Sequence, residues 1–163
     1  MRATWTRQTV GIALTAICAL ALGVAAGAQA PDPAVGTWKL DLAKSTYKPG
    51  PAPKSATVVI DAAGKDLKVA IDLVGADGVA MKYGYTSARD GKDVPVTGNP
   101  NYDTAAVTQA SPTEGTTVYK KGGKAVVTVK TSVSKDGKTM TATSAGTDPK
   151  GQATNNVAVF TKQ

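Results

Sequence analysis

Glycines recur along this chain at a nearly constant interval. The spacings are 14, 13, 32, 14 and 14 residues, measured between Gly64, Gly78, Gly91, Gly123, Gly137 and Gly151. Most of these glycines belong to Asp-Gly or Gly-Gly pairs, which supply the positive φ angles of tight hairpin turns. About ten residues between turns is enough for one strand, so the spacing predicts an antiparallel meander. The 32-residue interval is expected to hold two more strands.

Between the turns, apolar and polar residues alternate. The clearest runs are 67–73, 79–86, 124–133, 140–144 and 156–161, and weaker ones cover 56–61, 94–97, 104–110 and 116–121. A period of two is the pattern of strands with one buried face. We therefore expect an all-β fold of about nine to ten strands closed into a small barrel, because closure removes exposed strand edges. A two-sheet β-sandwich is the alternative.

The first thirty residues have the pattern of a secretory signal peptide. Arg2 and Arg7 precede an almost wholly apolar run from Val10 to Ala28. Small residues dominate the second half of that run, and cleavage is expected after Ala28 or Ala30. An uncleaved membrane anchor is the rival interpretation. The sequence thus predicts an exported protein, periplasmic or extracellular, with a single domain over residues 31–163.

The composition of the predicted mature chain excludes several classes of site. The only cysteine, Cys18, lies in the leader, and the chain has no histidine. Common nucleophile–base pairs and most zinc, copper and haem sites therefore lack their residues, and we expect no metal and no cofactor. Without Arg2 and Arg7, 17 basic residues face 12 acidic ones. Sixteen of those 17 are lysines and Arg89 is the only arginine, which argues against specific nucleic-acid binding. A weak contact with anionic envelope polymers is the alternative use of this charge.

The start of the predicted barrel carries a family motif. Gly36-Thr37-Trp38 resembles the G-x-W opening of the calycin superfamily, the lipocalins and their relatives. The resemblance implies that Trp38 is structural and closes one end of the barrel. In lipocalins a basic residue of the last strand lies over this tryptophan, and the corresponding residue here is Lys162, which can make a cation–π contact.

A second resemblance covers nearly all of the predicted mature chain. It rests on residues 36–46, 49–56 and 146–160, together with the Asp-Gly-Lys turns. These segments are similar to a group of bacterial secreted proteins that have no known activity. The resemblance therefore implies export and brings no known activity.

Carboxylate pairs are the only catalytic candidates that the sequence offers. Asp90 and Asp93 share one turn, and Asp61 and Asp66 flank another. Turn aspartates are normally solvated and bond to the local backbone, and no motif links these to a nucleophile. We therefore expect a protein that is not an enzyme.

Aromatic residues are the better candidates for a binding site. Tyr83 and Tyr85 share a strand face with Met81, and Tyr47 lies in a proline-containing loop, residues 45–55, that is expected to fringe a barrel mouth. Apolar liners with a few hydroxyls are typical of small-molecule pockets. We predict a ligand site at Met81, Tyr83, Tyr85, Met140 and Tyr47; the alternative is that these tyrosines are half-buried barrel residues.

Two functions follow from these observations. The first is a secreted, non-catalytic binding protein that holds a small apolar or amphipathic molecule inside a calycin-like barrel. The second is a cell-envelope interaction or stress protein without a ligand cavity, which contacts an anionic polymer or a protein partner. The volume of the interior separates the two: if Val127, Val129, Met140 and Phe160 meet and fill the barrel, the first hypothesis fails.

Overall fold

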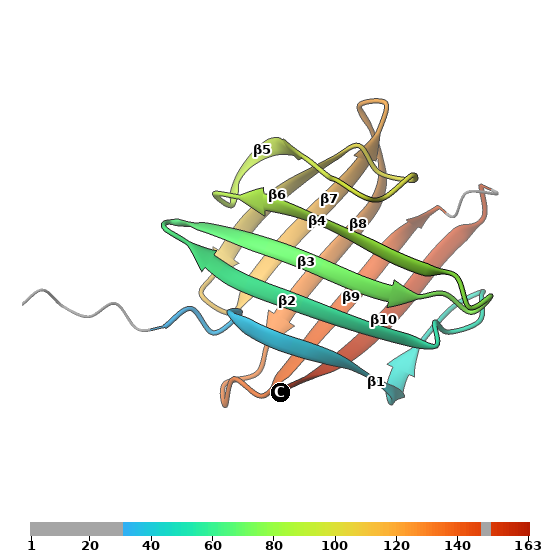
Figure 1. Ribbon diagram of the computed structural model, residues 1–163, viewed down its shortest axis with the longest axis horizontal. Helices are drawn as coiled ribbons and strands as arrows, with labels where there is room; N and C mark the ends of the chain where they lie inside the picture. The colour runs from blue at the N-terminus through green and yellow to red at the C-terminus, as the bar shows by residue number, and fades with distance from the viewer. Residues whose placement is uncertain (1–30, 148–150) are drawn as a thin grey trace, which may run out of the picture. The chain divides into compact units, whose positions relative to one another are not determined.

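The computed structural model describes residues 31–147 and 151–163 (Figure 1). The predicted signal peptide and both of its cleavage sites lie outside these residues. The described residues belong to one compact unit and form ten β-strands. They are β1 (Gly36–Thr46), β2 (Ser55–Ala63), β3 (Asp66–Val74), β4 (Ala80–Ser87), β5 (Asp90–Pro95), β6 (Thr104–Ser111), β7 (Glu114–Lys121), β8 (Lys124–Val133), β9 (Thr139–Thr147) and β10 (Ala153–Lys162).

The ten strands make one antiparallel sheet that curves into a nearly closed barrel (Figure 1). Their order is β4-β3-β2-β1-β10-β9-β8-β7-β6-β5, so every consecutive pair in the sequence except β4 and β5 is paired in the sheet, and β1 pairs with β10. This confirms the predicted all-β meander and barrel; the sandwich alternative is wrong. No helix among the described residues is long and apolar enough to cross a membrane.

One seam of the barrel, between β4 and β5, is not sealed. A single bridge joins its two sides: Gly84 and Thr97 exchange backbone hydrogen bonds of 3.0 Å in each direction. β5 is short and its register slips between Asp90 and Asp93, and it ends at Pro95, which has no N–H to donate. These features limit how far the two edge strands can pair.

Glycine turns are placed as the spacing predicts, with one exception. Gly64, Gly78, Gly123 and Gly137 all have positive φ and lie between consecutive strands. The long interval after Gly91 holds β6, β7 and most of β5. This is one strand more than the glycine spacing alone predicts, and it agrees with the three alternating runs at 94–97, 104–110 and 116–121. The extra turn, at residues 112–113, contains no glycine, so the glycine pattern could not reveal it.

The apolar core lies toward the barrel end at which β1 begins and β10 ends. Trp38 is fully buried and packs with side chains from five other strands: Ala56, Ile60, Leu67, Val133, Met140 and Phe160. The opposite end is bordered by the segments at residues 47–54, 75–79 and 96–103. The core therefore closes one end of the barrel. The interior next to the other end is the candidate site.

Candidate functional site

A cavity of about 460 Å³ occupies the barrel interior on the side away from Trp38. Its walls come from seven strands and three loops. They are formed by Tyr47, Pro51, Pro53, Ala56, Val58, Ile60, Val69, Ile71, Leu73, Gly75, Ala76, Tyr83, Tyr85, Tyr102, Thr117, Tyr119, Val127, Val129, Thr131, Met140, Ala142, Ser144, Asn156 and Phe160. Val127, Val129, Met140 and Phe160 line this space and do not fill it.

Four tyrosines form one wall, which crosses the inner side of the unsealed seam. Tyr83 and Tyr85 project from β4, Tyr102 from the loop before β6, and Tyr119 from β7. The rings of Tyr102 and Tyr119 stack with centroids 4.7 Å apart. Tyr83 meets Tyr102 edge-on at 6.4 Å, and Tyr85 meets Tyr119 edge-on at 6.0 Å. Ring contacts thus link the strands on either side of the seam, where backbone pairing is sparse.

Aliphatic side chains form the opposite wall and the floor. Alternation along β2 and β3 turns Val58, Ile60, Val69, Ile71 and Leu73 inward. Met140 and Phe160, which are 3% and 6% exposed and lie opposite each other on β9 and β10, belong both to this cavity and to the Trp38 core. The floor of the cavity is therefore the upper surface of the core.

No charged side chain is among the described residues that line the cavity. Burial raises the pKa of each of the four wall tyrosines above its usual range, and the neighbouring rings act in the same direction on Tyr83 and Tyr119. At neutral pH the cavity therefore presents only apolar surface and neutral hydroxyl and amide groups.

The structure brings together four of the five residues predicted for the site. Tyr47, Tyr83, Tyr85 and Met140 line the cavity, whereas Met81 is half-buried and is not among its lining residues. Met81 lies one residue into β4, opposite Leu73 on β3. The preceding Val79, which the alternation placed on the same face, is in the turn and is 61% exposed.

Two wall residues were not assigned from the sequence. Tyr102 follows a Gly-Asn-Pro-Asn turn, and a loop position gives no facing direction. Tyr119 lies in a run rich in Thr and Lys, in which the alternation is weak. The available signal was the two-residue period that places Tyr119 on the same face as Thr117, both of which are 8% exposed.

The closed end is organised around Trp38. The indole Nε1–H of Trp38 donates to the Ala34 carbonyl at 2.8 Å. The ammonium Nζ of Lys162 lies 4.9 Å from the centroid of the Trp38 ring and donates to the Pro33 carbonyl at 3.1 Å. The two residues thus occupy the positions that the calycin resemblance implies, and together they hold the segment before β1 against the barrel end.

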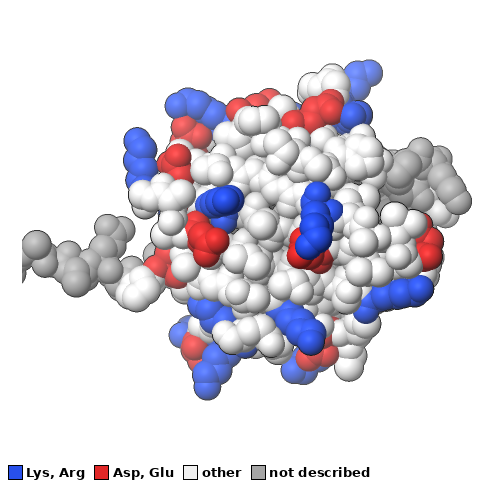
Figure 2. Space-filling model, in the orientation of Figure 1, with Lys and Arg blue, Asp and Glu red and all other residues white. Residues whose placement is uncertain are grey.

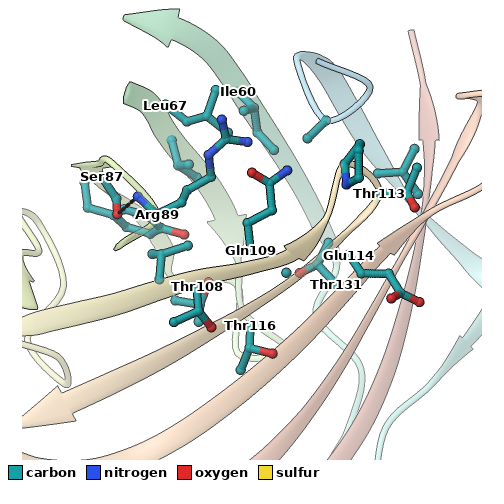
Figure 3. Close-up of a pocket in the computed structure, with 18 residues that line it drawn as sticks. Ile60, Leu67, Ser87, Arg89, Thr108, Gln109, Thr113, Glu114, Thr116 and Thr131 are labelled. Atoms are coloured by element: carbon teal, nitrogen blue, oxygen red, sulfur yellow. Dashed lines mark hydrogen bonds between the residues drawn. The ribbon is translucent and has the colours of Figure 1, made fainter. Parts of the chain in front are cut away.

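A smaller pocket of about 100 Å³ lies at this same end, beside the core. In Figure 3 the side chains of Arg89 and Gln109 extend toward each other next to Ile60 and Leu67. Arg89 has a φ of 60°, its N–H donates to Ser87 Oγ at 3.0 Å, and its guanidinium pairs with Asp32. Because Arg89 is already paired with Asp32, it is not available to bind an anion in this pocket. Its side chain instead helps to close this end of the barrel.

The candidate carboxylates are dispersed. Lys92 lowers the pKa of Asp90, and Asp93 pairs with Lys120. Among the residues that the structure describes, no three Asp, Glu, His or Cys side chains are placed to hold a metal ion together. None of the four carboxylates weighed in the sequence, Asp61, Asp66, Asp90 and Asp93, is among the residues that line the cavity.

No known protein family matches this chain, and no curated protein matches it in sequence. The fold itself, an antiparallel ten-stranded meander in a nearly closed barrel, is compatible with a calycin-like architecture.

Proposed function

We propose that the protein is an exported, non-catalytic binding protein that encloses a small apolar or amphipathic molecule in its barrel. The observation that carries this proposal is the cavity of about 460 Å³ between the tyrosine wall and the aliphatic wall. Ligand pockets of this kind are typically roughly 300–1,000 Å³, mostly apolar, with a few polar groups that orient the ligand. The pattern of the first thirty residues supports export.

Binding would come from removing the ligand's apolar surface from water. Each Å² of apolar surface buried contributes about 25 cal/mol before the costs of ordering are subtracted. The walls supply that surface with little rearrangement, because ring contacts and strand pairing already hold them. The hydroxyls of the tyrosine wall would orient any oxygen that the ligand carries.

A cavity-filling substitution tests the proposal with a matched control. Ser144 on β9 lines the cavity and is half-buried, whereas the next residue, Ala145, is exposed on the outer face. We expect Ser144→Phe to weaken binding of the neutral fluorescent probe N-phenyl-1-naphthylamine by about tenfold or more, which is about 1.4 kcal/mol. Ala145→Phe should leave the affinity unchanged.

The control decides how a negative result is interpreted. If the wild-type protein takes up no probe, the carrier proposal fails and the interaction protein becomes the better hypothesis. A salt-sensitive association with a polyanion would then be the next measurement. If both variants bind the probe as the wild type does, the probe lies on the surface and the assigned site is wrong.

The export part of the proposal has a separate readout. Expression in a secreting bacterial host should place the protein outside the cytoplasm with a mature N-terminus at Gln29 or Pro31, read by intact mass. A full-length protein retained in the membrane would support the uncleaved anchor instead.

A further inference from the structure

We propose that the cavity selects an uncharged ligand that carries at least one oxygen, a hydroxyl or a carbonyl, held at the hydroxyls of Tyr83 and Tyr102. This inference rests on the proposed function and narrows it. It excludes, as the natural ligand, fatty acids and other anions whose charged group would enter the barrel.

The composition of the cavity walls favours an uncharged ligand. All polar side chains among the described lining residues are neutral: five tyrosines, Thr117, Thr131, Ser144 and Asn156. A charged group that enters such a cavity loses its hydration and gains no counter-ion, which is costly. A neutral oxygen loses far less hydration free energy on entering the cavity. One hydrogen bond to a wall residue can compensate for that loss.

Three lysines on the outside of the barrel are held in ion pairs. Lys82 pairs with Asp72, Lys120 with Asp93 and Lys121 with Asp103, with N–O distances of 2.7 Å in each pair. Figure 2 shows basic and acidic groups side by side on one face of the barrel. These three lysines are therefore already paired, and a ligand carboxylate would have to compete with aspartate for them.

Lys48 and Lys54 are the two rim lysines on the 47–54 loop, and the described residues supply neither with an ion-pair partner. Both are exposed, so they could attract an anion only at the surface, where salt screens the interaction. An anionic ligand bound there would show a strong dependence on salt, which distinguishes it from a ligand held inside.

Two hydroxyls of the tyrosine wall are free to bind a ligand oxygen. Within residues 31–147 and 151–163, neither Tyr83 nor Tyr102 has a protein hydrogen-bond partner for its phenol oxygen, although both side chains are half-buried in the wall. Neither phenol oxygen is among the fully buried side-chain atoms that lack a partner, so both remain accessible to another molecule. A phenol hydroxyl both donates and accepts, so this pair can bind either a hydroxyl or a carbonyl oxygen of a ligand.

A set of probes with one skeleton tests the inference. The set has four members: pyrene, 1-pyrenemethanol, 1-pyrenecarboxylate and 1-pyrenemethylammonium. Binding of each is measured by fluorescence titration at pH 7.5. They differ only in whether the ring carries no head group, a neutral hydroxyl, an anion or a cation. We expect 1-pyrenemethanol to bind about tenfold more tightly than either charged probe, with no salt dependence.

The variants Tyr83→Phe and Tyr102→Phe keep the rings and remove only the hydroxyls. We expect each to reduce the preference for 1-pyrenemethanol over pyrene about fivefold, the value of one hydrogen bond, and to leave pyrene binding itself unchanged. The matched control is Thr86→Val, which removes a hydroxyl from an exposed side chain on the outer face of β4 and should preserve the preference.

The outcomes distinguish a failure of this inference from a failure of the proposed function. If no member of the set binds, the proposed function fails with it. If the anion or the cation binds as tightly as 1-pyrenemethanol, the protein is a carrier but the selection for uncharged ligands is wrong. If 1-pyrenemethanol is preferred and the two Phe variants do not change that preference, the oxygen is held elsewhere and the assignment to Tyr83 and Tyr102 is wrong.

Discussion

Lys162, the penultimate residue of the chain, places its ammonium over the indole of Trp38, 4.9 Å from the ring centroid. The two residues lie opposite each other on β10 and β1, the last and the first strands of the sequence. The contact also sets the space available to Gly36, where a Cβ would come within 2.5 Å of Lys162 Cε and where φ is 141°. Gly36, Trp38 and Lys162 therefore form one packed unit that joins the two ends of the meander.

Removing the charge of Lys162 should lower the stability of the barrel. We expect Lys162→Met to reduce the free energy of unfolding by about 1 kcal/mol, through loss of the cation–π contact and of the hydrogen bond to Pro33. The measurement is urea unfolding followed by far-UV circular dichroism. Lys39→Met, at an exposed lysine on β1, is the control and should change stability by less than about 0.5 kcal/mol. Equal effects of the two substitutions would remove the structural role assigned to Lys162.

The unsealed seam depends on a close backbone approach at Gly98. Its φ is 84°, and a Cβ there would lie 2.2 Å from the carbonyl oxygen of Lys82 on β4. Gly98→Ala should therefore destabilise the protein by about 3 kcal/mol, since it adds a backbone clash to the strain of positive φ. Gly137→Ala provides the comparison, because Gly137 has a φ of 68° and open space around it. Thermal unfolding that places both variants at the same midpoint would show that the seam contact is unimportant.

The sequence predicted the meander well because its turns are encoded locally. Asp-Gly and Gly-Gly pairs have a conformational requirement that can be recognised without any knowledge of the fold. The turn at residues 112–113 has no glycine pair, and the sequence indicates it only through the break between the alternating runs 104–110 and 116–121. The seam is a different case, because it follows from the register slip in β5 and from the distant contact of Gly98 with Lys82.

The site was predicted only in part, for a related reason. The two-residue period identifies which residues face inward, and it selected Tyr83 and Tyr85 correctly as cavity-lining positions. It does not say which end of a strand reaches a cavity, so Met81 was included although it does not line the space. Tyr102 and Tyr119 stack on each other from the loop before β6 and from β7. A contact between residues so far apart in the sequence has no local signature.

The burial of the tyrosine wall predicts a loss of stability at alkaline pH. Burial raises the pKa of Tyr83, Tyr85, Tyr102 and Tyr119 in the folded protein, whereas the unfolded chain ionises near pH 10. The stabilising contribution is therefore complete below about pH 10 and is lost as the pH rises through the folded pKa values.

Absorbance at 295 nm should show this behaviour directly. In urea the tyrosines should ionise near pH 10, and in the folded protein most should ionise at higher pH, together with unfolding. A native protein whose tyrosines all ionise near pH 10 while its circular dichroism is unchanged would contradict the buried wall.

Asp103 anchors the loop that carries Tyr102. Its carboxylate accepts hydrogen bonds of 2.7 Å from the Gly122 N–H and from Lys121 Nζ, and these two contacts hold its pKa below the usual value. The anchor is therefore intact at neutral pH and is lost as the pH falls through that lowered pKa.

Asp103→Ala should free this loop and weaken binding of N-phenyl-1-naphthylamine about threefold, because Tyr102 would no longer be held against Tyr119. Asp136→Ala removes a similar turn carboxylate at the other end of the barrel, bonded to Ser134 and Lys138. It should leave probe affinity unchanged. Probe titration at pH 7 distinguishes the two variants, and an equal loss in both would mean that the effect is not specific to the Tyr102 loop.

Native mass spectrometry of the protein, purified gently from a secreting host, tests the binding function most directly. The account predicts a discrete added mass that disappears on denaturation, is absent from Ser144→Phe and is retained in Ala145→Phe. A bare protein mass for the wild type, together with no uptake of the neutral probe, would contradict it.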